Sequence, residues 1–317
     1  MRKLLFAGVL ALGSMAMAAT GALAADWTPP GPIKLMIAFK AGGGSDTQAR
    51  LIAEELEKRH GWKILPENVV GKGGANLART MKDEANDGTV IGIAVTETYG
   101  YNMLATKNAG YTQADFTPLT TTTGFQMGIV ALTSKGWGSW DDFVAAAKAD
   151  TLRFGTMSPR LADVTYLLGK HLGVEFNIVP VKGGKGSMNG LNAGDLDVAW
   201  GAGIQTKSVV AGDMVNLAST MNERLKASPD APTFPEIGFN HTVEGYFLFS
   251  APAGIPDDAR TALTEAIAEI VNDENTGAGK LVRKAFGGAV TIKGAELEAL
   301  LAADAEAAKA LLAATSE

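Results

Sequence analysis

The stretch Ile33–Ala53, IKLMIAFKAGGGSDTQARLIA, predicts the plan that the rest of the chain follows. Its apolar run Ile33–Phe39 is typical of a buried strand, and a helical apolar stripe begins after the glycines Gly42–Gly44. A helix that starts directly after glycines leaves backbone N–H groups without partners, and the helix dipole adds positive charge there. Two interpretations stay open at this point: an anion-binding site, or a tight turn that Ser45 or Asp46 caps.

The first 24 residues have the pattern of a secretory signal peptide. Arg2 and Lys3 precede an apolar segment, and Ala22-Leu23-Ala24 is a cleavage pattern, so we expect cleavage before Ala25. No later stretch approaches the roughly 20 apolar residues that a membrane-spanning helix needs. We therefore expect an exported protein in the periplasm.

Composition excludes several classes of function. The chain has 317 residues, no cysteine and a net charge of −6, which becomes −8 once Arg2 and Lys3 are removed with the signal peptide. Disulfides, thiol catalysis and cysteine-bound metals are excluded, and the acidic balance argues against a nucleic-acid partner. The three histidines His60, His171 and His241 have no metal-ligand spacing. We expect neither a metal nor a cofactor.

Short apolar strands alternate with amphipathic helices along the chain. This alternation predicts an α/β fold with mainly parallel sheets covered by helices on both faces. Further strands are predicted from residue 64 and at 89–95, 126–132, 152–155, 176–181, 195–201 and 246–250. Helices are predicted at 46–60, 140–149 and 164–172, with a further helix ending at 81 and another starting at about 188. Two helices, 257–272 and 295–313, are predicted to close the chain.

Two glycine-rich segments look like nucleotide-binding loops but depart from the required patterns. In KGGKGS, residues 182–187, a glycine separates the lysine from the serine, and GKGGAN, residues 71–76, lacks the third glycine of a dinucleotide fingerprint. No serine stands in a G-x-S-x-G elbow. A pair of glycosidase carboxylates is not excluded by the sequence.

Several segments in order resemble the Bug-type periplasmic receptors of tripartite tricarboxylate transporters. They are IKLMIAFKAGGGSDTQARLIAEELEKRHG, ENVVGKGGANLA, DGTVIGIAVTET, DFTPLTTTT, LRFGTMS, GKGSMNGLNAGDLDVAWG, SPDAPTFPEIG and APAGIP. The resemblance implies a two-lobed Venus-flytrap fold, similar to type 2 periplasmic binding proteins, without catalytic activity. Lobe 1 would span 26–125 plus 244–317, and lobe 2 would span 126–243. The implied partners are a small carboxylate ligand and membrane permease subunits, and the receptor would be a monomer.

The resemblance also implies a binding site between the lobes. The loops Gly42–Asp46 and Gly73–Asn76 would hold a carboxylate with backbone amides, and loops Thr156–Ser158 and Gly183–Ser187 would close over it. The implied ligand-binding residues are Gly42, Gly43, Gly44, Ser45, Asp46, Gly73, Gly74, Asn76, Thr96, Glu97, Thr156, Met157, Ser158, Arg160, Gly183, Gly184, Ser187 and Gly201.

Departures from the family pattern leave the ligand class open. Arg160 or Lys185 could pair with a second carboxylate, and Glu97 could hold an amine or a hydroxyl, but each could also be an exposed loop charge. Two other functions remain alternatives: an exported hydrolase or isomerase acting on a carboxylate in the same cleft, and a sensory ligand-binding protein.

Overall fold

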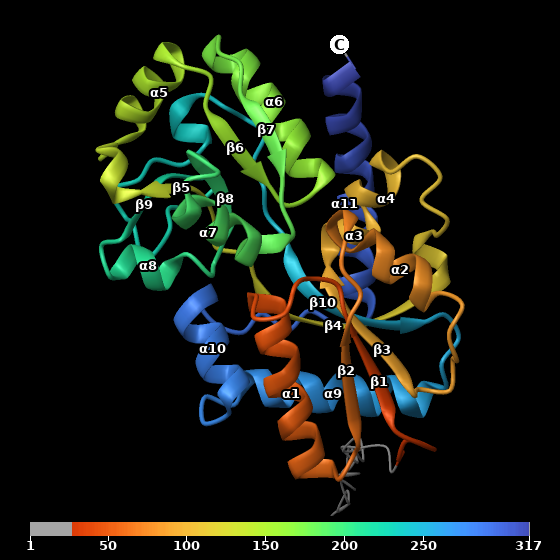
Figure 1. The fold of residues 1–317 in the computed structure, drawn as a ribbon. Helices are drawn as coiled ribbons and strands as arrows, with labels where there is room; N and C mark the ends of the chain where they lie inside the picture. The colour runs from red at the N-terminus through yellow and green to blue at the C-terminus, as the bar shows by residue number, and fades with distance from the viewer. Residues whose placement is uncertain (1–26, 317) are drawn as a thin grey trace, which may run out of the picture.

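The computed structural model describes residues 27–316, so the predicted signal peptide, residues 1–24, lies outside the described residues. The described chain forms two five-stranded sheets, each covered by helices, which make up two lobes (Figure 1). The α/β class and the two-lobed architecture predicted from the sequence are confirmed.

Sheet A has the strand order β2-β1-β3-β10-β4. β1 pairs in parallel with β2 and β3, whereas β10 is antiparallel to both β3 and β4. Four strands therefore run in one direction and β10 opposes them. The bounds are β1 Ile33–Ile37, β2 Ile64–Asn68, β3 Val90–Val95, β4 Phe116–Gly124 and β10 Tyr246–Pro252.

The alternation of side chains along β1 places helices on both faces of sheet A. Leu35 and its neighbours on one face pack with Ile52 of α1 (Gly44–His60) and Leu263 of α9 (Asp257–Asn272). Met36 on the other face packs with Leu77 of α2 (Ala75–Met81) and with α11 (Gly294–Ser316).

Sheet B repeats this plan with the order β7-β6-β8-β5-β9. β6 is parallel to β7 and β8, and β5 is antiparallel to β8 and β9, so again one strand opposes four. The strands are β5 Met127–Leu132, β6 Arg153–Thr156, β7 Asn177–Pro180, β8 Val198–Ala202 and β9 Met214–Ser219. The helices are α5 Trp140–Ala149, α6 Pro159–Leu172, α7 Gly183–Ala193 and α8 Thr206–Val210.

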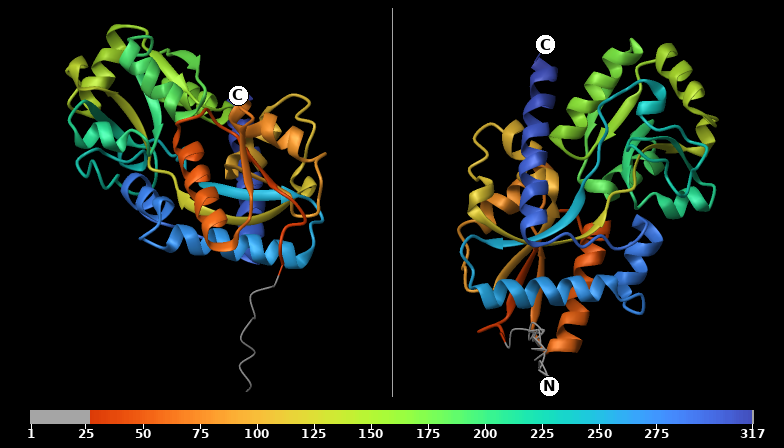
Figure 2. Two further views of the ribbon diagram at one scale, coloured as in Figure 1. Left: turned by 60° about the horizontal axis from the view of Figure 1, so that its bottom comes forward. Right: turned by 180° about the vertical axis from the view of Figure 1, so that it is seen from behind.

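The chain passes between the sheets twice, and each passage leads into the opposing strand. Phe125 and Gln126 join β4 to β5, and residues 220–245 join β9 to β10. Beyond β10, α11 stands on sheet A and also contacts α6 of the other lobe (Figure 2). The lobes are thus joined by one short and one long connection, and α11 contacts both.

The prediction that two helices close the chain was incomplete. A third helix, α10 (Gly277–Phe286), lies between them. The Thr276 hydroxyl accepts a hydrogen bond from the Gly279 amide at 2.8 Å, and Gly287 ends the helix in a left-handed conformation with φ 86°. Both capping residues can be recognised in the sequence, but the glycines in the first turn of α10 obscure its helical pattern.

Candidate functional site

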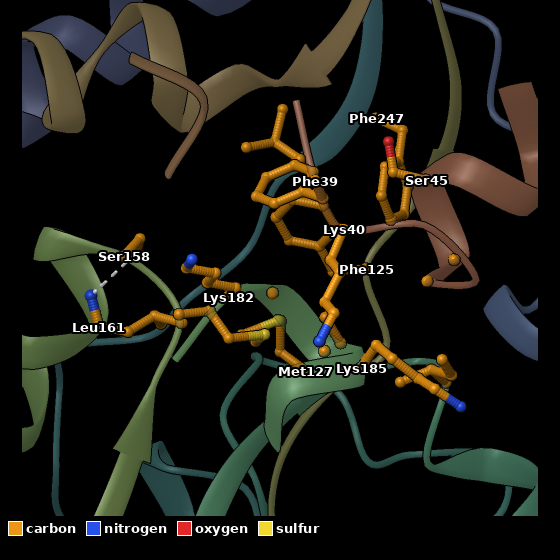
Figure 3. Close-up of a pocket in the computed structure, with 18 of the residues that line it drawn as sticks. Phe39, Lys40, Ser45, Phe125, Met127, Ser158, Leu161, Lys182, Lys185 and Phe247 are labelled. Carbon is orange, nitrogen blue, oxygen red and sulfur yellow. Dashed lines mark hydrogen bonds between the residues drawn. The ribbon is translucent and has the colours of Figure 1, made fainter. Parts of the chain in front are cut away.

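A pocket opens between the two sheets, where helix N-termini from both lobes meet (Figure 3). It contains about 650 Å³ of empty space, part of which is open to solvent. Its wall includes the first turns of α1, α6 and α7. Because first-turn N–H groups have no partners within their own helix, this convergence favours an anion.

The N-terminus of α1 is open towards the pocket. Its N-cap residue, Gly43, supplies no side-chain cap. Asp46, which the sequence offered as a cap, instead accepts a hydrogen bond from the Gly42 amide at 2.9 Å and from the side chains of Arg50 and Asn68, each also at 2.9 Å. Burial opposes ionisation, but these hydrogen bonds hold the pKa of the Asp46 carboxyl below its ordinary value. Asp46 therefore fixes the glycine loop and leaves the helix end free.

Ser45 is the most informative side chain in the first turn of α1. Its residue is only 3% exposed, it lines the pocket, and its hydroxyl has no hydrogen-bond partner. A buried hydroxyl without a partner costs roughly 1–3 kcal/mol. Such a group is expected where a bound molecule supplies the missing partner.

The N-terminus of α7 faces that of α1 across the pocket and is also open. Its N-cap residue, Lys182, makes no side-chain cap. A Cβ placed at Gly43 would lie 3.9 Å from the Cβ of Lys185, and one placed at Gly183 would lie 3.3 Å from the ring of Phe39. The two helix ends are therefore adjacent.

The N-terminus of α6 differs because its own residues satisfy it. The Ser158 hydroxyl accepts a hydrogen bond from the Leu161 amide at 3.4 Å, and Pro159, at the first helical position, has no N–H. Ser158 also approaches lobe 1, since a Cβ placed at Gly73 would lie 3.0 Å from the Ser158 Cβ. This end shapes the pocket and offers few free donors.

Three phenylalanines form the floor of the pocket. Phe125 lies on the first passage between the sheets, Phe247 on β10 and Phe286 at the end of α10. The ring of Phe247 is 5.3 Å from that of Phe125 and 5.2 Å from that of Phe286, both edge-to-face. Further apolar side chains line the walls: Phe39, Val95, Met127, Met157, Leu161 and Ile204.

The structure brings eight of the sequence-predicted site residues into this pocket. They are Gly43, Gly44, Ser45, Glu97, Met157, Ser158, Gly183 and Gly184. The other ten predicted residues do not line it within the described part of the chain: Gly42, Asp46, Gly73, Gly74, Asn76, Thr96, Thr156, Arg160, Ser187 and Gly201.

The second glycine loop supports the pocket from behind. The Gly73 carbonyl accepts hydrogen bonds from the Thr98 hydroxyl at 2.8 Å and the Asn102 side chain at 3.0 Å, and Asn76 donates to the carbonyl of Val70. These bonds tie the loop to the segment that carries Glu97.

Arg160 lies in a second, more polar pocket beside the first. It donates to the carbonyls of Glu244 and Thr242, at 3.2 and 3.4 Å. Glu97 lines both pockets, and Asp304 of α11 lines the second. Burial raises the pKa of the Asp304 carboxyl.

Sequence reasoning missed the apolar lining and the lysines Lys40 and Lys182. Lys40 extends from the β1–α1 loop across the pocket towards α7, whereas the ammonium group of Lys185 turns away from it (Figure 3). All three lysines are exposed. The apolar lining comes from segments far apart in the chain, so no local pattern could have identified it.

Residues 27–316 are the part of the chain that the structure describes. No group of three histidine or acidic side chains among them is placed to hold a metal ion. None of their helices is long and apolar enough to cross a membrane.

The chain is similar to several known proteins. Residues 48–289 match the model of the tripartite tricarboxylate transporter family receptor. A protein of Agrobacterium vitis, described as the UPF0065 protein in the TAR-I ttuE-ttuC' intergenic region, is 31% identical over 263 residues, 80% of this chain and 75% of that protein.

Solved structures show the same fold. The periplasmic binding protein BugD has a TM-score of 0.80 at 22% identity, over 91% of this chain and 99% of that one. R. palustris Rpa4515 with adipate also has a TM-score of 0.80, at 24% identity, over 92% of this chain and 99% of that one. The chain belongs to the Bug-type receptor family of tripartite tricarboxylate transporters.

Proposed function

We propose that this protein is a periplasmic receptor that captures a small carboxylate by lobe closure and delivers it to the membrane permease of a tripartite tricarboxylate-type transporter. The observation that carries the proposal is the pair of open helix N-termini, α1 and α7, facing each other across one pocket. The adipate bound to the R. palustris neighbour supports a carboxylate as the ligand class.

The ligand carboxylate would lie between the two helix ends. First-turn amides of α1 and α7 would donate to its oxygens, and the unpartnered Ser45 hydroxyl would donate a further hydrogen bond. Several donors are required because burying an uncompensated carboxylate is very costly.

Closure would bring lobe 2, residues 126–243, against lobe 1, residues 26–125 plus 244–317. Contacts across this boundary include a hydrogen bond of 2.5 Å from the Tyr101 hydroxyl to Asp163, and the approach of Gly183 to Phe39. A ligand that touches both helix ends stabilises the closed form, because it gains its α7 contacts only there.

The test uses the chain from residue 25 onward, expressed and purified without denaturation. A thermal-shift screen against mono-, di- and tricarboxylates, amino acids and neutral sugars should give a rise in melting temperature with acids. Replacing Gly184 by valine should abolish the rise, because even a Cβ there lies 3.0 Å from Ile204. Val210, exposed on α8, changed to alanine is the control.

Three outcomes would contradict the proposal. A shift with sugars but with no acid would exclude the carboxylate site. An acid that returns chemically altered after incubation would favour the rival function, an exported enzyme using the same cleft. Small-angle scattering that does not change when the acid binds would exclude lobe closure.

A further inference from the structure

The pocket carries one anion site, at the α1 and α7 ends, and apart from Ser158 and Glu97 the rest of its buried lining is apolar. The donors are concentrated at the α1 and α7 ends, where two helix N-termini are open and the Ser45 hydroxyl has no partner. The third helix end, that of α6, is satisfied by Ser158 and has a proline in its first turn. One carboxylate placed between the α1 and α7 ends would accept hydrogen bonds from both.

The body of the ligand would lie against apolar side chains of phenylalanine and methionine. The floor is the edge-to-face cluster of Phe125, Phe247 and Phe286, each less than 10% exposed. Met127 and Met157 add flexible apolar surface from lobe 2. Methionine adapts to irregular shapes, so this wall suits an aromatic ring or an alkyl chain.

Glu97 is the acidic side chain that lines this pocket. The residue is 7% exposed, and its carboxylate accepts one hydrogen bond, from the Asn102 side chain at 3.3 Å. Within the described residues it takes part in no ion pair. A second carboxylate on a ligand that fills the pocket would share a poorly hydrated space with this negative charge.

The nearby cations form no ion pair with Glu97 within the described chain. Arg160 lines the neighbouring pocket, which Glu97 also borders, but its guanidinium donates to two backbone carbonyls. Lys40, Lys182 and Lys185 are exposed, so water and salt screen their charges. The structure therefore disfavours the earlier possibility that Arg160 receives a second carboxylate.

We propose that the ligand is a monocarboxylate with an aromatic or alkyl body, and that Glu97 is the residue that rejects dicarboxylates. This inference rests on the proposed function and narrows it. The ligand carboxylate binds between the α1 and α7 ends, the apolar body lies on the phenylalanine floor, and a second carboxylate meets Glu97 without a counter-charge.

The experiment compares acids that differ only in a second carboxylate. Calorimetric titrations at neutral pH and about 0.15 M salt use two pairs, in each of which a terminal methyl group is replaced by a carboxylate: hexanoate with adipate, and 4-ethylphenylacetate with benzene-1,4-diacetate. At a few ångströms in a partly desolvated site, like-charge repulsion predicts that each monoacid binds at least about tenfold more tightly than its diacid. Glu97→Gln should narrow this ratio by about the same factor, mainly by improving diacid binding.

The matched control is Glu54→Gln, which removes the same charge from an exposed position on α1. It should leave both ratios unchanged. A diacid that binds the wild-type protein as tightly as its monoacid would overturn the inference while leaving the carboxylate receptor intact, and this result needs no variant to fold. An unchanged ratio in Glu97→Gln would equally remove Glu97 from the argument. If no acid of any class binds, the proposed function itself fails.

Discussion

The variant Ser45→Ala tests whether the Ser45 hydroxyl binds ligand or stabilises the fold. The Ser45 hydroxyl is buried without a hydrogen-bond partner, so its removal breaks no bond in the free protein. Because such a group carries a desolvation cost of roughly 1–3 kcal/mol, the variant should unfold at the same urea concentration as the wild type or a higher one. Stability alone therefore gives the first readout.

The second readout is ligand affinity. A hydrogen bond from a neutral hydroxyl to a carboxylate contributes roughly 1.5–3 kcal/mol. Losing it should weaken binding of the acid found in the screen by about 10- to 150-fold, since each 1.4 kcal/mol is a factor of ten. Calorimetric titration measures this change directly. The thermal shift at a fixed ligand concentration should also become smaller, because the stabilisation by ligand depends on the logarithm of the ratio of ligand concentration to Kd.

Ser250→Ala is the matched control, because Ser250 is equally buried but has a partner. Its hydroxyl is 2.5 Å from that of Tyr99, in the interior of lobe 1. Burial raises the pKa of Tyr99 to about 12, so the phenol stays neutral and loses its partner in the variant. We expect lower stability with unchanged affinity. If Ser45→Ala instead destabilises the protein as Ser250→Ala does and binds ligand normally, the assignment of Ser45 is refuted.

Three further predictions concern the scaffold. The ion pair with Arg153 holds the pKa of Asp197 well below its ordinary value. The ionised Asp197 therefore stabilises the fold fully above about pH 4, and this stabilisation is lost as the pH falls towards the lower pKa of the folded state. In urea titrations, Asp197→Asn should make stability fall less steeply below about pH 4. Tyr101→Phe removes the hydrogen bond to Asp163 across the lobes. The ligand-bound variant should have a larger radius of gyration in small-angle scattering, with an unchanged circular dichroism spectrum. Gly42 has φ +75° and open space around it, so Gly42→Ala should cost about 1 kcal/mol through backbone strain, and Gly42→Asn less, by urea unfolding.

Elements with strong local periodicity could be predicted from the sequence. Helix α9 occupies the predicted residues 257–272, and α5 the predicted residues 140–149. The two helices that form the lobe 2 side of the site start five residues earlier than predicted, at Pro159 and Gly183. Their first turns hold a proline or several glycines, and burial against the sheet outweighs a propensity cost of about 1 kcal/mol for each glycine.

The character of the pocket could not be predicted, because it depends on contacts between distant segments. Phe125 and Phe247 lie at the two passages that the sequence placed between the lobes, but nothing local shows that their rings touch. Phe286 comes from the helix that the sequence prediction missed. The glycine loop was visible because strand, glycines and helix are contiguous, and its open helix end follows from local rules alone.

In the proposed mechanism, the division between a polar end and an apolar floor would determine which part of the ligand drives closure. A shift from a mostly open to a mostly closed ensemble needs a ligand that favours the closed form by about 5.5 kcal/mol. Each hydrogen bond from an α7 amide to the carboxylate would supply roughly 1.5–3 kcal/mol of this difference. Covering about 100 Å² of ligand surface with Met127, Met157 and Ile204, which lobe 2 contributes, adds about 2.5 kcal/mol. In the proposed mechanism the carboxylate would fix where the ligand binds, and an apolar body would bring the sum of one such hydrogen bond and the covered surface to about 4–5.5 kcal/mol, close to the amount that closure requires.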